Sequence, residues 1–490
     1  MSKPDWRWAV AGGTAVVLIS SVIGVVRALA MDHAMTGPPG HDMAMPVPGA
    51  RIPLQGMPLS EMPEMFAAAA GLLLVIAGTA LRTGRRPQPP PEGKRRLFAA
   101  VIGTAALTID VSKTSTLGFV IPGLRAEYGL DAKAASFLAV AGLTGTAIGA
   151  VVFGVLADRW GRRGSYLVAT LAFAATSMCG SMPTFAGNVV MCALMGTSVG
   201  GLAPLLIVML TDALRSSSRS SAVIALSVLA SAVGYLVAAG SALWLEPVFG
   251  WRVLWLIGAP TGLALAALTP WVPDRIEPRE TAGIAEAVHV RALGSGLQRG
   301  YAFLIGVLTF GLTTWVPSLA RSGGLAVATA NLWLSVAAVV MVPCALLLTW
   351  CHRRFGPVRL SAGLAAATAA LLLVLTGSGA VSSVAWVCAG ALVAALFSVN
   401  TMAAVFLPIA ADLADPAGRG RTTGAVSLCN RLGGLCGPLL IAAFVYSASD
   451  VLVAVAALAL CSAVAACWIG RRHRIAVRET VQPDGEAGAR

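Results

Sequence analysis

The feature that most limits the fold of this sequence is a series of apolar stretches, each long enough to cross a lipid bilayer as a helix. A bilayer core about 30 Å thick needs about 20 apolar residues in a helix. Hydrophobic residues make up 57% of the chain and charged residues only 12%. A typical soluble protein has about twice that charged share. We therefore predict an all-α membrane protein.

Turn residues and charges divide these stretches into fourteen predicted spans. Two lie at the N-terminus, near Trp8–Ala30 and Pro63–Leu81. The other twelve are, in order, Leu97–Ile121, Ala135–Ala157, Ser165–Met182, Asn188–Leu210, Ser221–Trp244, Val253–Trp271, Tyr301–Leu319, Ala326–Trp350, Leu360–Thr376, Ser383–Ala410, Thr423–Tyr446 and Val451–Ile469. The first stretch has a basic start and ends in Ala28-Leu29-Ala30, which is also typical of a cleaved signal peptide. Its length favours an uncleaved helix.

Basic residues occur in short clusters that fall on alternate loops, among them Arg82–Arg96, Asp274–Arg299 and the tail Arg471–Arg474. Cytoplasmic loops of membrane proteins carry an excess of Lys and Arg. We therefore predict that this face and both termini are cytoplasmic, unless the first span is cleaved. The net charge of +13 fits this distribution. No nucleic-acid motif is present, so we expect no nucleic-acid partner.

An acidic and basic turn, GVLADRWGRR, joins the second and third of the twelve spans. Its pattern resembles the loop between the second and third helices of the major facilitator superfamily, a group of secondary transporters, and the resemblance covers about Leu97–Gly470. It implies a cytoplasmic gate built from Gly154, Asp158, Arg159, Gly161, Arg162 and Arg163. We expect Gly154 to let two helices approach closely. The alternative is an ordinary basic loop.

Two charged residues at the cytoplasmic end of the fourth span, Asp212 and Arg215, are further gate candidates. The alternative for them is a solvated loop.

The resemblance implies twelve helices in two six-helix halves. A second basic turn, HRRFGPVR from His352, follows the eighth helix as the first motif follows the second, and such an internal repeat is typical of paired halves. The predicted parts are an N-terminal extension 1–96 with an extracytoplasmic loop 31–64 and a basic cytoplasmic linker 82–96, an N-terminal half 97–271, a cytoplasmic linker 272–300, a C-terminal half 301–470 and a cytoplasmic tail 471–490.

Ionisable side chains inside an apolar span are costly, so they mark functional candidates. Asp110 and Lys113 lie three residues apart in the first superfamily helix and therefore share a face. The following stretch, Thr116–Leu124, is similar to the first helix of the aromatic-acid and sugar-porter branches. This resemblance implies a role for Asp110 in proton coupling or substrate handling. Those relatives carry a second acid at the position of Lys113, whose positive charge instead suits an anion. The alternative is a structural ion pair.

Arg431 lies in the eleventh span, within SLCNRLGGLCGPLL, which resembles the Arg-x-Gly and Gly-Pro arrangement of the same branches. An arginine can bind a carboxylate or phosphate through two parallel hydrogen bonds, or it can pair with an acid of the protein. Asn400 in the tenth span offers a neutral hydrogen-bonding group. We expect the substrate near the bilayer midplane, facing these two residues and the Asp110–Lys113 pair.

Methionine, cysteine and histidine cluster at the predicted extracytoplasmic face. The segment Met31–Met45 resembles the Met/His-rich stretches of bacterial copper-handling proteins, and thioether, thiolate and imidazole groups suit Cu(I). The candidate ligands are Met31, His33, Met35, His41, Met43 and Met45, together with two M-C-x-x-M copies, Met178, Cys179, Met182 and Met191, Cys192, Met195. The alternatives are a disordered linker for the loop and membrane core packing for the two copies.

We expect a proton-coupled secondary transporter with alternating access in a bacterial inner membrane, acting on a small solute and preferably an organic anion. The first alternative is a copper or copper-complex transporter that uses the Met/His-rich loop. The second is a copper-binding membrane sensor or assembly factor that transports nothing. The sequence has no nucleotide-binding P-loop, nucleophile elbow or zinc motif. We therefore expect no enzyme activity and no required cofactor, a copper ion being the one candidate. The expected partners are a small-molecule substrate, protons and lipid, with the chain as a monomer.

Overall fold

The computed structural model describes residues 6–30, 56–57, 59–178, except 82–92, and then 182–202, 205–206, 210, 219–274, 291–322, 327–379, 385–413, 419–444 and 448–481. Within these ranges the regular elements are all helices. They are α1 (Trp6–Ala30), α2 (Pro63–Leu81), α3 (Gly93–Tyr128), α4 (Ala132–Trp160), α5 (Arg162–Thr176), α6 (Phe185–Gly200), α8 (Arg219–Phe249), α9 (Val253–Leu256), α10 (Gly258–Ala267), α11 (Arg291–Ser322), α12 (Val327–Phe355), α13 (Pro357–Gly377), α15 (Ala385–Leu413), α16 (Arg419–Phe444) and α17 (Ala448–Val481), with short 3-10 turns η1 (Leu59–Glu61) and η3 (Thr269–Trp271).

Each predicted span overlaps one of these helices, and the sixth superfamily span overlaps the pair α9 and α10. Eight helices in the described ranges are long and apolar enough to cross a membrane. The prediction of an all-α membrane fold is therefore confirmed, while the number of crossings stays a prediction. Several helices extend past the predicted span ends: α3 reaches Tyr128 and α17 reaches Val481.

The chain divides into two compact units. Unit 1 comprises Met1–Ala213, Val233–Glu277 and Pro317–Val339, and unit 2 comprises Leu214–Ala232, Pro278–Val316 and Val340–Arg490. In unit 1, α4 packs along α6 and α5 packs along α10. In unit 2, α13 packs along α17, and α15 contacts both α13 and α16. The predicted division into halves and linker stays a prediction.

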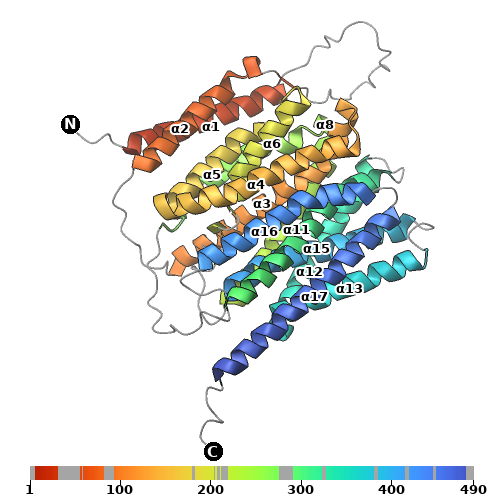
Figure 1. Cartoon of the computed structure of the whole chain (residues 1–490). Coiled ribbons are helices and arrows are strands. Elements are labelled where there is room, and N and C mark those ends of the chain that lie inside the picture. Colours follow the sequence, from red (N-terminus) through yellow and green to blue (C-terminus); the bar gives the residue numbers. More distant parts are fainter. Residues whose placement is uncertain are drawn as a thin grey trace, which may run out of the picture. The chain divides into compact units, whose positions relative to one another are not determined.

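The N-terminal helices α1 and α2 lie side by side as a hairpin that also contacts α5 and α10 of unit 1 (Figure 1). Glycine makes the close approach possible, because a Cβ placed on Gly13 would lie 2.5 Å from the carbonyl oxygen of Gly71. Arg27 and Glu64 join the two helices through an ion pair of 3.2 Å, and the Glu64 side chain is buried. The hairpin is therefore packed onto unit 1.

The two basic turns share one backbone conformation. Gly161 separates α4 from α5 with φ 79° and ψ 165°, and Gly356 separates α12 from α13 with φ 79° and ψ 162°. A positive φ of this size favours glycine, because a Cβ would be strained there. The internal repeat read from the sequence is thus present in the backbone, one copy in each unit.

The expectation of close helix packing at Gly154 was wrong. A Cβ added at Gly154 would meet no atom within 4 Å. The close approach in α4 lies about one to three turns earlier, where a Cβ on Gly145 would lie 2.0 Å from Ala193 O and one on Gly149 would lie 2.1 Å from Thr197 O. Glycine permits contact but does not create it, because the contact also needs a neighbouring helix at that position.

Candidate functional site

Asp110 and Lys113 lie inside unit 1 on successive turns of α3, and each side chain is 4% exposed. An ammonium group buried in a membrane helix needs acceptor atoms, because the bilayer core supplies no water. Lys113 Nζ donates a hydrogen bond to the backbone carbonyl of Leu254, 3.1 Å away. The pair predicted from the sequence is therefore buried on one helix, and its cation is anchored to the sixth span.

The Leu254 carbonyl lies beside a break in the sixth span. α9 ends at Leu256 and α10 begins at Gly258. Ile257, between the two helices, donates its N–H to Val253 O, four residues earlier, as in an ordinary α-helix. A carbonyl oxygen has two lone pairs, so Leu254 O can accept from Lys113. The bond therefore joins α3 to α9 next to this break.

Two buried aromatic residues lie on α9 and α8, which both pack against α3. Trp255 follows Leu254 directly, and Tyr235 follows Gly234, where α8 approaches α3 so closely that a Cβ would lie 2.7 Å from Thr108 O. In the described part of the chain, neither Tyr235 Oη nor Trp255 Nε1 has a hydrogen-bond partner. A buried polar group without a partner costs about 1–3 kcal/mol. These two atoms are therefore candidates for contact with a bound molecule.

Arg431 lies in unit 2 on α16, is 6% exposed, and places its guanidinium over the ring of Phe310 at 5.4 Å from the ring centroid. α16 packs tightly on α11 at this level. A Cβ on Gly306 would lie 1.9 Å from the carbonyl oxygen of Asn430, and the Asn430 side chain donates to Ala302 O at 3.0 Å. The glycines of this stretch also allow close packing, because a Cβ on Gly433 would lie 2.0 Å from Phe303 O and one on Gly437 would lie 2.6 Å from Val307 O.

Asn400 is buried on α15, where its Nδ2 donates a hydrogen bond to the carbonyl oxygen of Leu396 in the same helix, at 2.9 Å. The amide nitrogen is therefore engaged with its own helix. The role of Asn400 in substrate contact stays a prediction.

A third buried cation, Arg252, was not found by sequence reasoning. It is 1% exposed and donates to Met182 O at 2.7 Å, to Tyr128 Oη at 2.9 Å and to the carboxylate of Glu127. Trp251 Nε1 donates to the same carboxylate at 2.8 Å. We call these residues, together with Asn188, the Arg252 cluster, since Asn188 Nδ2 donates to Tyr128 Oη at 3.1 Å.

The Arg252 cluster was missed because one predicted span ended at Ile121 and another began at Val253, so Glu127, Tyr128, Trp251 and Arg252 were read as loop. The signal available in the sequence was a Glu-Tyr pair just after one span and a Trp-Arg pair just before another.

Among the predicted gate residues, Arg163 makes a defined contact. Its Nε donates to Val272 O at 2.8 Å, which ties the start of α5 to the residue after η3. Arg159 is exposed and Arg162 is half-buried. The Asp158 side chain, Asp212 and Arg215 lie outside the described part of the chain. The gating role of this motif stays a prediction.

Several predicted copper ligands lie outside the described residues, namely Met31, His33, Met35, His41, Met43, Met45 and Cys179. The others are buried. Met178 packs on α1, where a Cβ on Gly24 would lie 2.0 Å from its Cε, and Cys192 Sγ lies 3.6 Å from Leu138 O of α4. These contacts fit the packing alternative. The metal role of the Met178, Met182, Met191, Cys192 and Met195 set stays a prediction.

Comparison with known proteins identifies the family of this chain. The family model described as Major Facilitator Superfamily matches residues 97–407. The chain is 25% identical over 319 residues to the 4-hydroxybenzoate transporter PcaK of Acinetobacter baylyi, covering 56% of this chain and 69% of the relative. It is 23% identical over 285 residues to the niacin transporter NiaP of the same organism, covering 50% of this chain and 65% of the relative. The chain thus spans about two thirds of each relative.

A solved structure agrees on the fold. The crystal structure of a D-xylose–proton symporter superposes with a TM-score of 0.60 at 17% identity and covers 76% of this chain and 97% of that one. At this identity the likeness concerns the fold alone. The family match covers more than half of the sequence, so the chain is a multi-pass membrane transporter that belongs to the Major Facilitator Superfamily.

Proposed function

We propose that this chain is a proton-coupled carrier of a small aromatic carboxylate, which it moves across a bacterial inner membrane by alternating access. Two relatives are named for 4-hydroxybenzoate and niacin, and each of these compounds is an aromatic ring that bears a carboxylate. The observation that carries the proposal is the buried Lys113 ammonium, which donates to a carbonyl of α9, together with the buried Tyr235 and Trp255 of the same unit, whose polar atoms lack a partner in the described residues.

Lys113 supplies the charge for the carboxylate. An anion that leaves water loses its solvation, so it enters an apolar helix bundle only where a positive group is already in place. The bond to Leu254 O holds the ammonium on the inner side of α3 and prevents it from extending toward the bilayer surface. A carboxylate that arrives there joins the acceptors around Nζ.

Tyr235 and Trp255 suit the aromatic ring. Their rings offer faces and edges for the offset or edge-to-face contacts that aromatic groups prefer. Tyr235 already makes such a contact with Phe119, at 6.1 Å between centroids. Their unmatched Oη and Nε1 atoms can satisfy a ring substituent such as a hydroxyl. A substrate that pairs these atoms gains the hydrogen bonds that the empty carrier lacks.

Asp110 couples the proton. Asp110 lies one turn from Lys113 on α3. When Asp110 is ionised, its negative charge offsets the positive charge that attracts the substrate. When protonated, it leaves that charge to the carboxylate. Proton binding therefore strengthens anion binding, and by linkage the anion strengthens proton binding to the same degree. A carrier with this coupling moves the two together.

The test is uptake of radiolabelled 4-hydroxybenzoate by liposomes that contain the purified full-length chain and an alkaline interior. Accumulation should exceed that in empty liposomes, which report diffusion of the protonated acid through lipid, and a protonophore should abolish the excess. Unlabelled niacin should compete and xylose should not. Uptake equal to that of empty liposomes under every gradient would remove the proposal.

A further inference from the structure

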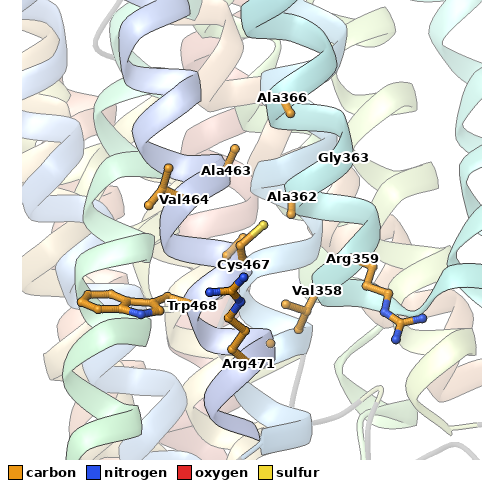
Figure 2. Close-up of a pocket in the computed structure, with 12 residues that line it drawn as sticks. Val358, Arg359, Ala362, Gly363, Ala366, Ala463, Val464, Cys467, Trp468 and Arg471 are labelled. Carbon is orange, nitrogen blue, oxygen red and sulfur yellow. The ribbon is translucent and has the colours of Figure 1, made fainter. Parts of the chain in front are cut away.

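A groove with a volume of about 720 Å³ lies within unit 2 between α13 and α17 (Figure 2). Small and apolar residues line most of it. Arg359 and Arg471 lie at one end, beside Val358 and Trp468, and the apolar lining continues from there toward Ala366 and Ala463. None of the lining residues, all of which are described, is acidic.

The groove is open to the surroundings of the protein. Val464 is 61% exposed and Trp468 is 56% exposed. A Cβ on Gly363 would meet no atom within 4 Å, so the groove has open space in front of this residue. In a multi-pass membrane protein an apolar surface of this kind faces lipid rather than water. The apolar part of the groove therefore has the dimensions and chemistry for a hydrocarbon chain.

The charged end of the groove lies at the depth of lipid headgroups. The apolar segment of α13 begins at Val358 and that of α17 ends at Arg471, so both arginines lie at the limit of the apolar segments. Trp468 lies less than one turn from Arg471, and tryptophan is enriched at this interface. The helices converge here, because a Cβ on Gly470 would lie 3.2 Å from Val358 Cγ1.

We propose that this groove binds one anionic phospholipid, with its phosphate at Arg359 and Arg471 and an acyl chain along the walls that α13 and α17 provide. Charge complementarity decides the occupant: two cations with no lining acid favour a lipid with net negative charge over a zwitterionic one. The acyl chain adds little discrimination, since it leaves one hydrocarbon environment for another. The selectivity of the groove therefore resides in the two guanidinium groups.

The test is native mass spectrometry of the delipidated full-length protein titrated with phosphatidylglycerol or with phosphatidylcholine of the same chain length. The wild type should bind one phosphatidylglycerol more tightly than phosphatidylcholine. The double variant Arg359→Gln, Arg471→Gln should weaken phosphatidylglycerol binding by about tenfold or more, with phosphatidylcholine unchanged. Gly363→Leu adds an apolar side chain to the groove wall, at a position where the first added atom meets nothing within 4 Å, and should weaken both lipids.

Two matched controls separate the groove from general surface effects. Arg354→Gln removes an exposed arginine of α12 that does not line the groove, and Gly390→Leu adds the same side chain at an open position of α15. Both should bind phosphatidylglycerol as the wild type does. Inorganic phosphate should not displace the lipid. Unchanged phosphatidylglycerol affinity in the double variant, or full displacement by phosphate, would overturn the proposal.

Discussion

Two buried cations of unit 1 are held in contrasting ways. Lys113 lies in the middle of α3 and donates to the backbone carbonyl of Leu254. Two buried aromatic residues of the same unit, Tyr235 and Trp255, have polar atoms without a hydrogen-bond partner in the described part of the chain. Arg252 lies just before α9 and donates to a carbonyl, a hydroxyl and a carboxylate. Lys113 therefore joins α3 to α9 through a neutral acceptor, whereas Arg252 joins three chain segments and has an acidic partner.

The difference suggests two roles for a buried charged side chain, one in ligand binding and one in the stability of the fold. A buried charge that the fold itself satisfies contributes to the folded state, and removing it destabilises the protein. Burial alone, 4% exposed for Lys113 and 1% for Arg252, does not distinguish the two. The kind of partner does: Lys113 donates to a backbone carbonyl, whereas Arg252 pairs with the carboxylate of Glu127.

The largest expected effect is on transport by Lys113→Ala. Removing a buried charge that pairs with a ligand costs about 2–5 kcal/mol, so uptake of 4-hydroxybenzoate should fall by about 100-fold. The double variant with Asp110→Asn should express better than the single variant, because the remaining carboxyl no longer carries a buried charge. Ser115→Ala, a buried change on the same helix, should transport normally. Full uptake by Lys113→Ala would make the pair structural and erase the contrast with Arg252.

The complementary experiment is Arg252→Ala, which should affect stability more than transport. The change removes the donor to Met182 O and Tyr128 Oη and leaves Glu127 without its cation, at a cost of about 2 kcal/mol given that Glu127 is partly exposed. The melting temperature in detergent should drop by several degrees. Arg125→Ala at the same end of α3 should lower it less. An unchanged melting temperature would show that the cluster contributes nothing to stability.

Much of this contrast could not be predicted from the sequence. Apolar periodicity and turn residues located the helices, and the spacing of Asp110 and Lys113 placed them on one face of α3. Spacing could not reveal the Leu254 carbonyl, because the contact joins residues 141 positions apart and depends on how α3 and α9 pack. Span ends set by hydropathy excluded the Arg252 cluster, since α3 stays helical through polar residues to Tyr128.

Glycine was a weak guide to contact for a related reason. Gly154, in the recognised motif, faces open space, whereas Gly145 and Gly149 press on α6. A missing side chain allows approach, but the residue across the interface decides whether approach occurs. Conversely, the positive φ at Gly161 is a local property of the turn. The motif that contains it was therefore recognisable without knowledge of the fold.

A smaller effect is expected in unit 2, where Arg431 can sharpen the comparison because its guanidinium lies over the ring of Phe310. A guanidinium stacks on a ring better than a compact ammonium does. Arg431→Lys should therefore lower uptake by about tenfold while Phe310→Leu lowers it by about threefold. Initial rates in liposomes with matched protein content measure both. Equal rates for wild type and Arg431→Lys would place Arg431 among the structural cations.

The smallest effect is expected at the first basic turn. Asp158→Asn should reduce the transport rate by a few fold and leave membrane insertion nearly intact, because a single charge at the membrane surface contributes about 0–1 kcal/mol to folding. Rates are compared at equal amounts of inserted protein, with Arg159→Gln as the companion change in the same motif. A variant that transports at the wild-type rate would remove the gate role implied by the family resemblance.

The central claim, that Lys113 recognises a carboxylate, is tested most directly by binding. Equilibrium dialysis of the purified protein compares 4-hydroxybenzoate with its neutral analogue 4-hydroxybenzamide, which keeps the ring and hydroxyl. The wild type should prefer the acid by about tenfold or more, and Lys113→Ala should bind both compounds equally, whereas Arg252→Ala should keep the preference. Retention of the acid preference in Lys113→Ala would contradict the account.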